Sequence, residues 1–129
     1  MRALTKSLPA AWRNAFDALP ELYGPAGEVL RAARAALPDI PSIANALDAL
    51  DALARSAAPL VLALHIDLAD LRGYHYHNGA IFSVYTAGEP NAVGRGGRYD
   101  GIGKAFGRAR PATGFTLDLR QVAGLLARA

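Results

Sequence analysis

The stretch "GGRYDGIGKAFGRARPATGFTLDL", from Gly96 to Leu119, contains the features that decide the fold. A loop rich in glycine and basic residues is followed by "ATGFTLDL", a short apolar run typical of a β-strand. Before it, "GAIFSVYTAGEPNAVGRGG" predicts two more strands around the turn "AGEPNA". Strands that follow one another through short turns pair antiparallel most easily. We therefore expect an antiparallel sheet, closed by a helix over "RQVAGLLARA".

The first half of the chain has the period of amphipathic helices instead. Apolar residues at helical spacing predict three helices, within residues 10–24, 25–40 and 41–59. Pro41 and Ser42 are typical of a helix start, with Ser42 as a candidate cap. The period changes near Pro59. The prediction is an α+β fold, with a helical segment over residues 1–59 followed by a sheet with flanking helices over residues 60–129.

Composition limits the class of protein. A chain of 129 residues fits one domain, and 52% hydrophobic with 19% charged residues argues against disorder. The absence of cysteine excludes disulfides and thiolate metal sites, and fits a cytoplasmic protein. No apolar run approaches the roughly 20 residues that span a bilayer, so we expect no membrane partner. A net charge of +3 permits an anionic ligand without requiring one.

The glycine-rich loop does not match the nucleotide motifs. "GIGKAF" supplies Gly103 and Lys104, but Ala105 stands where a P-loop has the hydroxyl that binds magnesium. Arg98 occupies the position of the first P-loop glycine, and the dinucleotide spacing also fails. We expect no nucleotide cofactor.

The histidines and the basic segment also fit two other functions, a zinc site and nucleic-acid binding. On a strand, His75 and His77 would share a face, and with His65 they could form a three-histidine set of the kind seen in some zinc enzymes. Packing or hydrogen bonding along a strand is the simpler reading, and we expect no metal. A basic stripe with interleaved aromatic residues is also typical of nucleic-acid binding. It would consist of Arg95, Arg98, Lys104, Arg108 and Arg110 with Tyr99 and Phe106. The small net charge instead favours a solvated loop, so nucleic acid is not the expected partner.

Two motifs in the same order make a specific resemblance. "LRGYHYHNGAIF" (Leu71–Phe82) resembles the histidine-recognition motif of histidyl-tRNA synthetases, usually close to RGLDYYTGTVFE. The segment from Gly96 to Leu119 resembles their next signature, GGRYDGL, followed by a glycine-rich loop, PAxGF and class II motif 3. The resemblance covers about residues 60–127. It implies part of a class II aminoacyl-tRNA synthetase-like antiparallel sheet.

The departures from the synthetase pattern concern ATP. Motif 3 usually reads close to GFAMGLER, and its arginine binds ATP. Here Gln121 stands at that position, Arg120 comes one residue early, and Asp118 replaces a glycine. Three residues of the histidine motif replace an aspartate, a tyrosine and a glutamate: His75, His77 and Ser83. The resemblance therefore implies that adenylation is lost and that the chain is not an enzyme.

A synthetase-like chain with an altered ATP site resembles the regulatory subunit of ATP phosphoribosyltransferase. The helical stretch with "LPELYG" and "EVLRAARAALPDIPSIANALDAL" is similar to that family as well. The resemblance implies a subunit of histidine biosynthesis that does no aminoacylation, assembles with the short-form catalytic subunit and mediates feedback inhibition by histidine. An alternative is a truncated histidyl-tRNA synthetase-like protein that binds histidine or tRNA.

The family's chain is more than twice as long, and class II motifs 1 and 2 are absent, which predicts a C-terminal fragment. A class II sheet uses strands from both halves of the longer chain, so one sheet edge is expected to lack a neighbour. We therefore expect a homodimer. The competing expectation is a monomer whose helices fold over the sheet.

The resemblance also implies the ligand site. Tyr99 faces the histidine ligand, and Arg72 binds its carboxylate or a neighbouring acid. The expected histidine-binding residues are Arg72, Tyr76, His77, Gly97, Tyr99 and Gly114. For Arg98 and Asp100, a ligand role and a structural ion pair or turn cap both stay open. No catalytic residue, cofactor or metal is expected.

Overall fold

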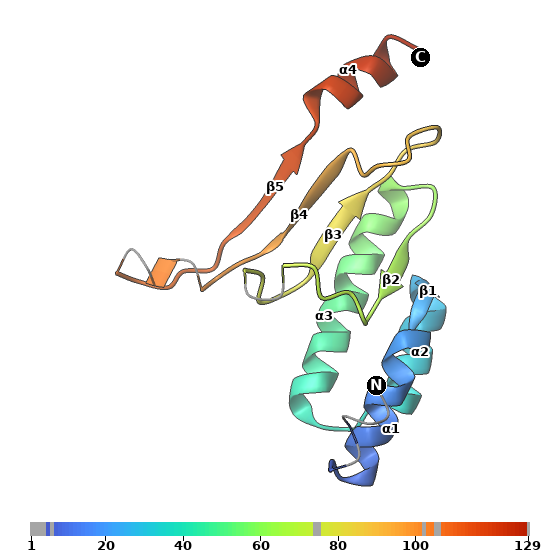
Figure 1. The fold of residues 1–129 in the computed structure, drawn as a ribbon, viewed down its shortest axis with the longest axis vertical. Coiled ribbons are helices and arrows are strands. Elements are labelled where there is room, and N and C mark those ends of the chain that lie inside the picture. The colour runs from blue at the N-terminus through green and yellow to red at the C-terminus, as the bar shows by residue number, and fades with distance from the viewer. Residues whose placement is uncertain (1–4, 6, 74–75, 102, 105–106, 129) are drawn as a thin grey trace. The chain divides into compact units, whose positions relative to one another are not determined.

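The computed structural model describes residues 5, 7–73, 76–101, 103–104 and 107–128 (Figure 1). They form helices and antiparallel strands, as predicted. The chain divides into two compact units, residues 1–70 (unit 1) and residues 71–129 (unit 2). The division comes after Asp70, whereas the sequence analysis began the second region at residue 60. No helix in the described part of the chain has the length and apolar character needed to cross a membrane.

The helices of unit 1 occur where the apolar period predicts them. They are α1 (Ala10–Ala18), η1 (Leu19–Glu21), α2 (Ala26–Ala36), α3 (Pro41–Ala57) and η2 (Ala58–Leu60). The expectation that Ser42 caps α3 is wrong. The N-cap is Ile40, whose carbonyl accepts from the amides of Ile43 and Ala44 at 3.0 Å, and no side chain caps this end. Pro41 starts the helix because its fixed φ suits the first turn and it has no N–H to satisfy.

A small sheet that the sequence analysis did not predict explains the position of the boundary. Strand β1 (Tyr23–Pro25) pairs antiparallel with β2 (His65–Asp67), with Gly24 opposite Ile66. Gly24 has φ of 134°, in the region that favours glycine. A hydrogen bond of 3.0 Å from the Leu68 amide to the Leu22 carbonyl continues the pairing. Residues 65–68 therefore belong to the helical unit.

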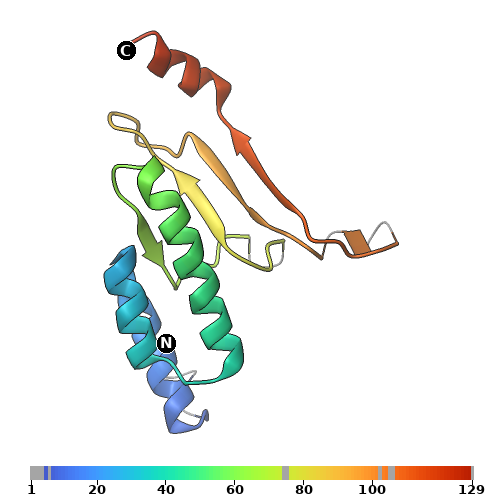
Figure 2. The same cartoon turned by 180° about the vertical axis from the view of Figure 1, so that it is seen from behind.

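One apolar core holds unit 1 together. Helices α2 and α3 lie side by side in both views (Figures 1 and 2). The buried members of the core are Leu22, Val29, Leu30, Ala33 and Leu47. Partly buried residues pack around them: Leu19, Leu37, Ile43, Leu50, Ile66 and Leu68. Each fully buried large aliphatic side chain contributes about 1.5–3 kcal/mol, so burial is the main source of this unit's stability.

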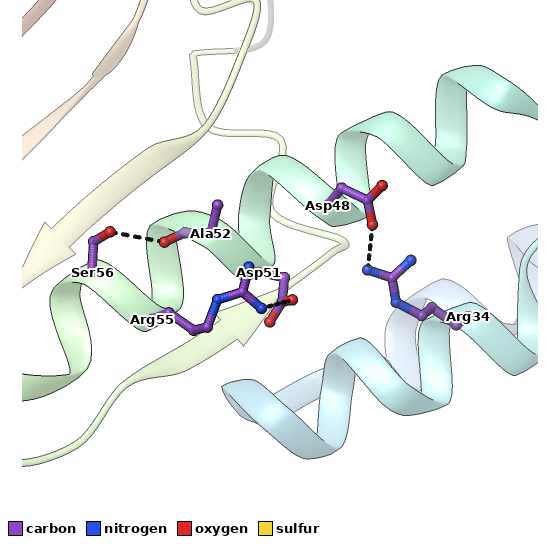
Figure 3. Close-up of polar contacts among 6 residues, drawn as sticks. All are labelled: Arg34, Asp48, Asp51, Ala52, Arg55 and Ser56. Atoms are coloured by element: carbon purple, nitrogen blue, oxygen red, sulfur yellow. Dashed lines mark hydrogen bonds and ion pairs between the residues drawn. The ribbon is translucent and has the colours of Figure 1, made fainter.

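Charged residues of α2 and α3 form ion pairs with one another (Figure 3). Arg34 pairs with Asp48 at 2.7 Å and so links the two helices. Arg55 pairs with Asp51 one turn earlier on α3. Neither aspartate belongs to the apolar core. Such exposed pairs contribute about 0.2–1 kcal/mol each, much less than the core.

Unit 2 is built on a three-stranded sheet. Strands β3 (Ile81–Val84), β4 (Gly94–Arg98) and β5 (Thr113–Leu117) are antiparallel in the order β3-β4-β5 (Figures 1 and 2). The two strands around "AGEPNA", the strand in "ATGFTLDL" and the closing helix α4 (Leu119–Leu126) are confirmed.

The register of this sheet separates two kinds of face, because side chains alternate along each strand. One face carries a row of Ser83, Arg95 and Thr116 and a neighbouring row that contains two glycines, Gly97 and Gly114. The other face is apolar and consists of Phe82, Val84, Phe115 and Leu117, all exposed by more than a third.

Candidate functional site

A cavity of about 580 Å³ lies in unit 2. This volume falls within the roughly 300–1,000 Å³ typical of small-molecule sites. Five of the six residues predicted to bind histidine line it: Arg72, Tyr76, His77, Tyr99 and Gly114. Gly97 does not line it and lies behind His77 instead.

Three aromatic rings form a continuous part of the cavity wall. The centroids of Tyr76 and Tyr99 are 5.2 Å apart, with the rings tilted by 36°. His77 meets Tyr76 edge-on at 4.9 Å and Tyr99 at 6.2 Å. These separations are those at which aromatic pairs attract one another. The three rings therefore support one another and present an aromatic surface to a ligand.

Glycines on the strands leave room for these rings. A Cβ on Gly114 would clash with the Tyr99 hydroxyl, and a Cβ on Gly97 would lie only 2.7 Å from His77 Nδ1. The His77 Nδ1 atom is buried against β4 and has no hydrogen-bond partner among the described residues. Gly97 is therefore a positioning residue, since it determines how closely His77 approaches the sheet.

A tight turn presents Tyr76 and His77 to the cavity. The amides of both residues donate to the carbonyl of Gly73 at 2.8 Å. Gly73 has φ of 69°, the left-handed region in which a side chain is strained. Gly73 therefore allows the backbone of the turn to form, and the turn brings the rings of Tyr76 and His77 to the cavity wall.

Arg98 and Asp100 have a structural role. The Arg98 Nε–H donates to Asp100 Oδ2 at 2.7 Å. The other carboxylate oxygen accepts from the Ala112 amide at 3.0 Å, and the Asp100 amide donates to Asn78 Oδ1 at 2.8 Å. Neither residue lines the cavity. The structure thus favours the ion pair and turn over a ligand role, because Asp100 ties together the chain on both sides of the glycine-rich loop.

The cavity carries positive charge. Two arginines line it, Arg72 and Arg95, and none of its lining residues among those described is acidic. The acids of unit 2 are engaged elsewhere: Glu89 pairs with Arg128, Asp100 pairs with Arg98, and Asp118 caps α4. Cationic side chains in a concave site favour an anionic ligand.

Sequence reasoning missed one polar part of the wall. Ser83, Arg95 and Thr116 all line the cavity, yet none of them was predicted to bind the ligand. Arg95 had been considered only as a member of the basic stripe, and Ser83 only as a departure from the histidine motif. The sequence offers no signal for this row, because the three residues share a face only through the register, which pairs Ser83 with Arg95 and Arg95 with Thr116. Of the other members of the stripe, Arg98 is in its ion pair, and Phe106 lies outside the described residues.

The three histidines do not meet in one described site. His65 belongs to β2 of unit 1, and His77 belongs to the cavity wall of unit 2. His75 lies outside the described residues. Within the described ranges, no group of three metal-ligating side chains occurs.

Comparisons with known proteins identify relatives of the chain. The chain is 62% identical over 125 residues to an ATP phosphoribosyltransferase regulatory subunit of Ralstonia nicotianae, and 59% identical to one of Ralstonia pickettii. Each match covers 97% of this chain and 32% of the relative. The chain thus spans about a third of the length of these curated relatives.

The fold has a counterpart among solved structures. A crystal structure described as an ATP phosphoribosyltransferase regulatory subunit/histidyl-tRNA synthetase from Bacillus halodurans matches with a TM-score of 0.76 and 23% identity. The match covers 94% of this chain and 32% of that chain, and it confirms the class II synthetase-like fold. A family model for histidyl-tRNA synthetase matches residues 1–122. The chain therefore belongs to the histidyl-tRNA synthetase family and, within it, is similar to regulatory subunits of ATP phosphoribosyltransferase.

Proposed function

We propose that this chain is part of a non-catalytic regulatory subunit of ATP phosphoribosyltransferase in histidine biosynthesis. In this role it supports a short-form catalytic subunit and mediates feedback inhibition by histidine. The names of the relatives with 62% and 59% identity support the assignment. The cavity supports the effector, because its aromatic wall and two arginines suit an aromatic amino acid with a carboxylate.

The start of α4 is the observation that carries the non-catalytic part of the proposal. In the synthetase pattern an arginine that binds ATP stands where this chain has Gln121. The Asp118 carboxylate accepts hydrogen bonds from the amides of Arg120 and Gln121 at 3.0 Å. The N-terminus of a helix attracts anions, and here a carboxylate occupies it. An ATP phosphate at this end would meet negative charge in place of the usual cation.

Each of the six predicted residues has a defined role in the proposed effector site. The rings of Tyr76, His77 and Tyr99 pack against the imidazole of histidine, and Arg72 lies where it can bind the carboxylate. Gly97 and Gly114 act indirectly, because they let His77 and Tyr99 lie close to the sheet.

The effector proposal is tested in the full-length parent subunit, in complex with a short-form catalytic subunit from the same genome. Tyr99→Ala should raise the histidine concentration needed for half-inhibition by about 5- to 150-fold, the equivalent of one lost buried hydrogen bond or more. Assembly of the complex, measured by size exclusion, should not change. Tyr85→Ala is the matched control, since Tyr85 is 58% exposed and does not line the cavity. Unchanged inhibition in the Tyr99 variant would remove this residue from the site.

The non-catalytic role has its own test. Magnesium-dependent ATP–pyrophosphate exchange with histidine should stay at background. Exchange above background would favour the alternative, a histidyl-tRNA synthetase-like protein that binds histidine or tRNA, over the regulatory role.

We also propose that the chain forms a homodimer. Within the described residues, β3 and β5 each have a strand neighbour on only one side. Unpaired strand edges and exposed apolar faces favour association, and the apolar face of this sheet includes Phe115, which is 69% exposed. Light scattering after size exclusion should give twice the mass of the chain, and a monomer at high micromolar concentration would contradict the proposal.

A further inference from the structure

We propose that the cavity contains a second subsite, formed by Ser83, Arg95 and Thr116, that binds a phosphate-type oxyanion. The proposal deepens the proposed function, since it concerns the same cavity, but it does not depend on histidine as the effector. The subsite is defined by the register of the sheet, by the absence of a competing acid and by its separation from the aromatic wall.

The register places the three side chains in one row. Arg95 of β4 lies opposite Ser83 of β3 on one side and opposite Thr116 of β5 on the other. Directly paired residues on antiparallel strands share a face, with Cβ atoms about 4.5–5.5 Å apart. All three residues line the cavity. The row therefore offers one guanidinium between two hydroxyl groups.

Nothing among the described residues neutralises Arg95. Its side chain has no hydrogen bond or ion pair with any residue that the structure describes. The synthetase pattern has a glutamate at the position of Ser83, directly beside residue 95 in the register. A glutamate there would pair with the arginine, and Ser83 instead leaves the guanidinium available and adds a hydroxyl donor.

The row is separate from the aromatic wall. Along β4, Arg95 is two residues from Gly97, the glycine that lies behind His77. Two residues of a strand span about 7 Å, so a ring against His77 and an oxyanion against Arg95 do not compete for the same space. The cavity of about 580 Å³ is large enough for both groups.

The donor set favours phosphate over carboxylate. A guanidinium provides two parallel N–H groups, and the two hydroxyls provide donors on either side. A phosphate group has enough oxygens to accept from all of them, whereas a carboxylate has two oxygens, which the guanidinium alone satisfies. The chemistry is the same for a free phosphate and for a phosphate carried by a larger ligand.

Calorimetric titration of the 129-residue chain with inorganic pyrophosphate tests the subsite. Arg95→Gln should weaken binding at least about tenfold, and Arg95→Lys should give an intermediate loss because it keeps the charge but not the planar donor pair. Arg108→Gln is the matched control, since it removes the same charge from a residue that does not line the cavity. No binding to the unaltered chain, or equal losses in the Arg95 and Arg108 variants, would overturn the proposal.

Two further arms separate this subsite from the effector site and distinguish the sources of phosphate. Tyr99→Ala should keep pyrophosphate affinity within about twofold, and a parallel loss there would overturn the separation of the two subsites. If histidine does not bind but pyrophosphate binding still depends on Arg95, the proposed effector fails and the subsite stands. Tighter binding of ADP than of pyrophosphate, again dependent on Arg95, identifies a phosphate carried by a larger ligand, and equal affinity identifies the free anion.

Discussion

The two units of this chain are stabilised in different ways. Unit 1 contains the apolar core, and the buried hydrophobic residues of unit 2 are only Ala92 and Val93 among those described. All glycines except Gly24 and Gly27 lie in unit 2. There, close contact between backbone and side chains takes the place of a thick apolar layer. A sheet that does not need its aromatic residues for a core leaves them available to line a cavity.

Charge divides in the same way. Residues 1–70 contain six Lys and Arg and eight Asp and Glu, whereas residues 71–129 contain eight Lys and Arg and only three Asp and Glu. The net charge of +3 for the whole chain is therefore the sum of an acidic unit 1 and a strongly basic unit 2. Positive charge is thus concentrated in the unit with the smaller core, and positive charge favours the attraction of anions to that unit.

The largest expected effect on stability comes from shortening a buried side chain in the core of unit 1. Leu47→Ala should lower the free energy of unfolding by about 2–5 kcal/mol, because Leu47 is 5% exposed on α3. Leu53→Ala on the same helix is the control and should cost about 1 kcal/mol or less, since Leu53 is 50% exposed. Denaturant unfolding followed by the fluorescence of Trp12, the single tryptophan, measures both. Equal losses would mean that the core does not dominate this unit.

Replacing a glycine by alanine should change stability in opposite directions in the two units. Gly114→Ala should destabilise unit 2 by about 1–3 kcal/mol, because the new Cβ collides with the Tyr99 hydroxyl. Gly27→Ala should stabilise α2 by about 0.5–1 kcal/mol, since nothing lies within 4 Å of that Cβ. Thermal unfolding by circular dichroism gives the signs, and the Tyr99 ring resonances report the collision. A stabilising Gly114→Ala would contradict the close packing.

Helix α4 should depend on its cap more than the helices of unit 1 do. It has no fully buried residue, and Asp118 supplies two hydrogen bonds at its start, whereas α1, α2 and α3 have no side-chain cap. Asp118→Ala should cost about 1 kcal/mol. Faster amide exchange in α4, with Asp118→Asn close to the original chain, is the expected result. An unchanged exchange rate in the alanine variant would show that the cap contributes nothing.

The exposed ion pair of unit 1 should have the smallest effect. A double-mutant cycle on Arg34 and Asp48, which are 2.7 Å apart, should give a coupling of about 0.2–1 kcal/mol. The coupling should shrink in 0.5 M salt because both side chains are exposed. A coupling above about 2 kcal/mol would place this pair on a level with the core and remove the contrast between them.

The local periods of the sequence determined most of the elements. Apolar residues at helical spacing predicted α2 and α3, and alternation with a central turn predicted β3 and β4, because these elements follow from the side chains within each segment. Five of the six residues that the motif resemblance predicts to bind histidine line the cavity, and their binding of a ligand stays a prediction. The resemblance also predicted Gly97, which the structure places behind His77.

Contacts between distant segments decided the rest. Strand β1 has no strand pattern of its own and exists because β2, about forty residues later, supplies its hydrogen bonds. The boundary after Asp70 follows from that pairing. Likewise, the sequence does not indicate that Ser83, Arg95 and Thr116 lie together, and only the register of three strands places them in one row. A sequence specifies which face each residue takes along its own strand, but which residues face one another across strands depends on how the strands align.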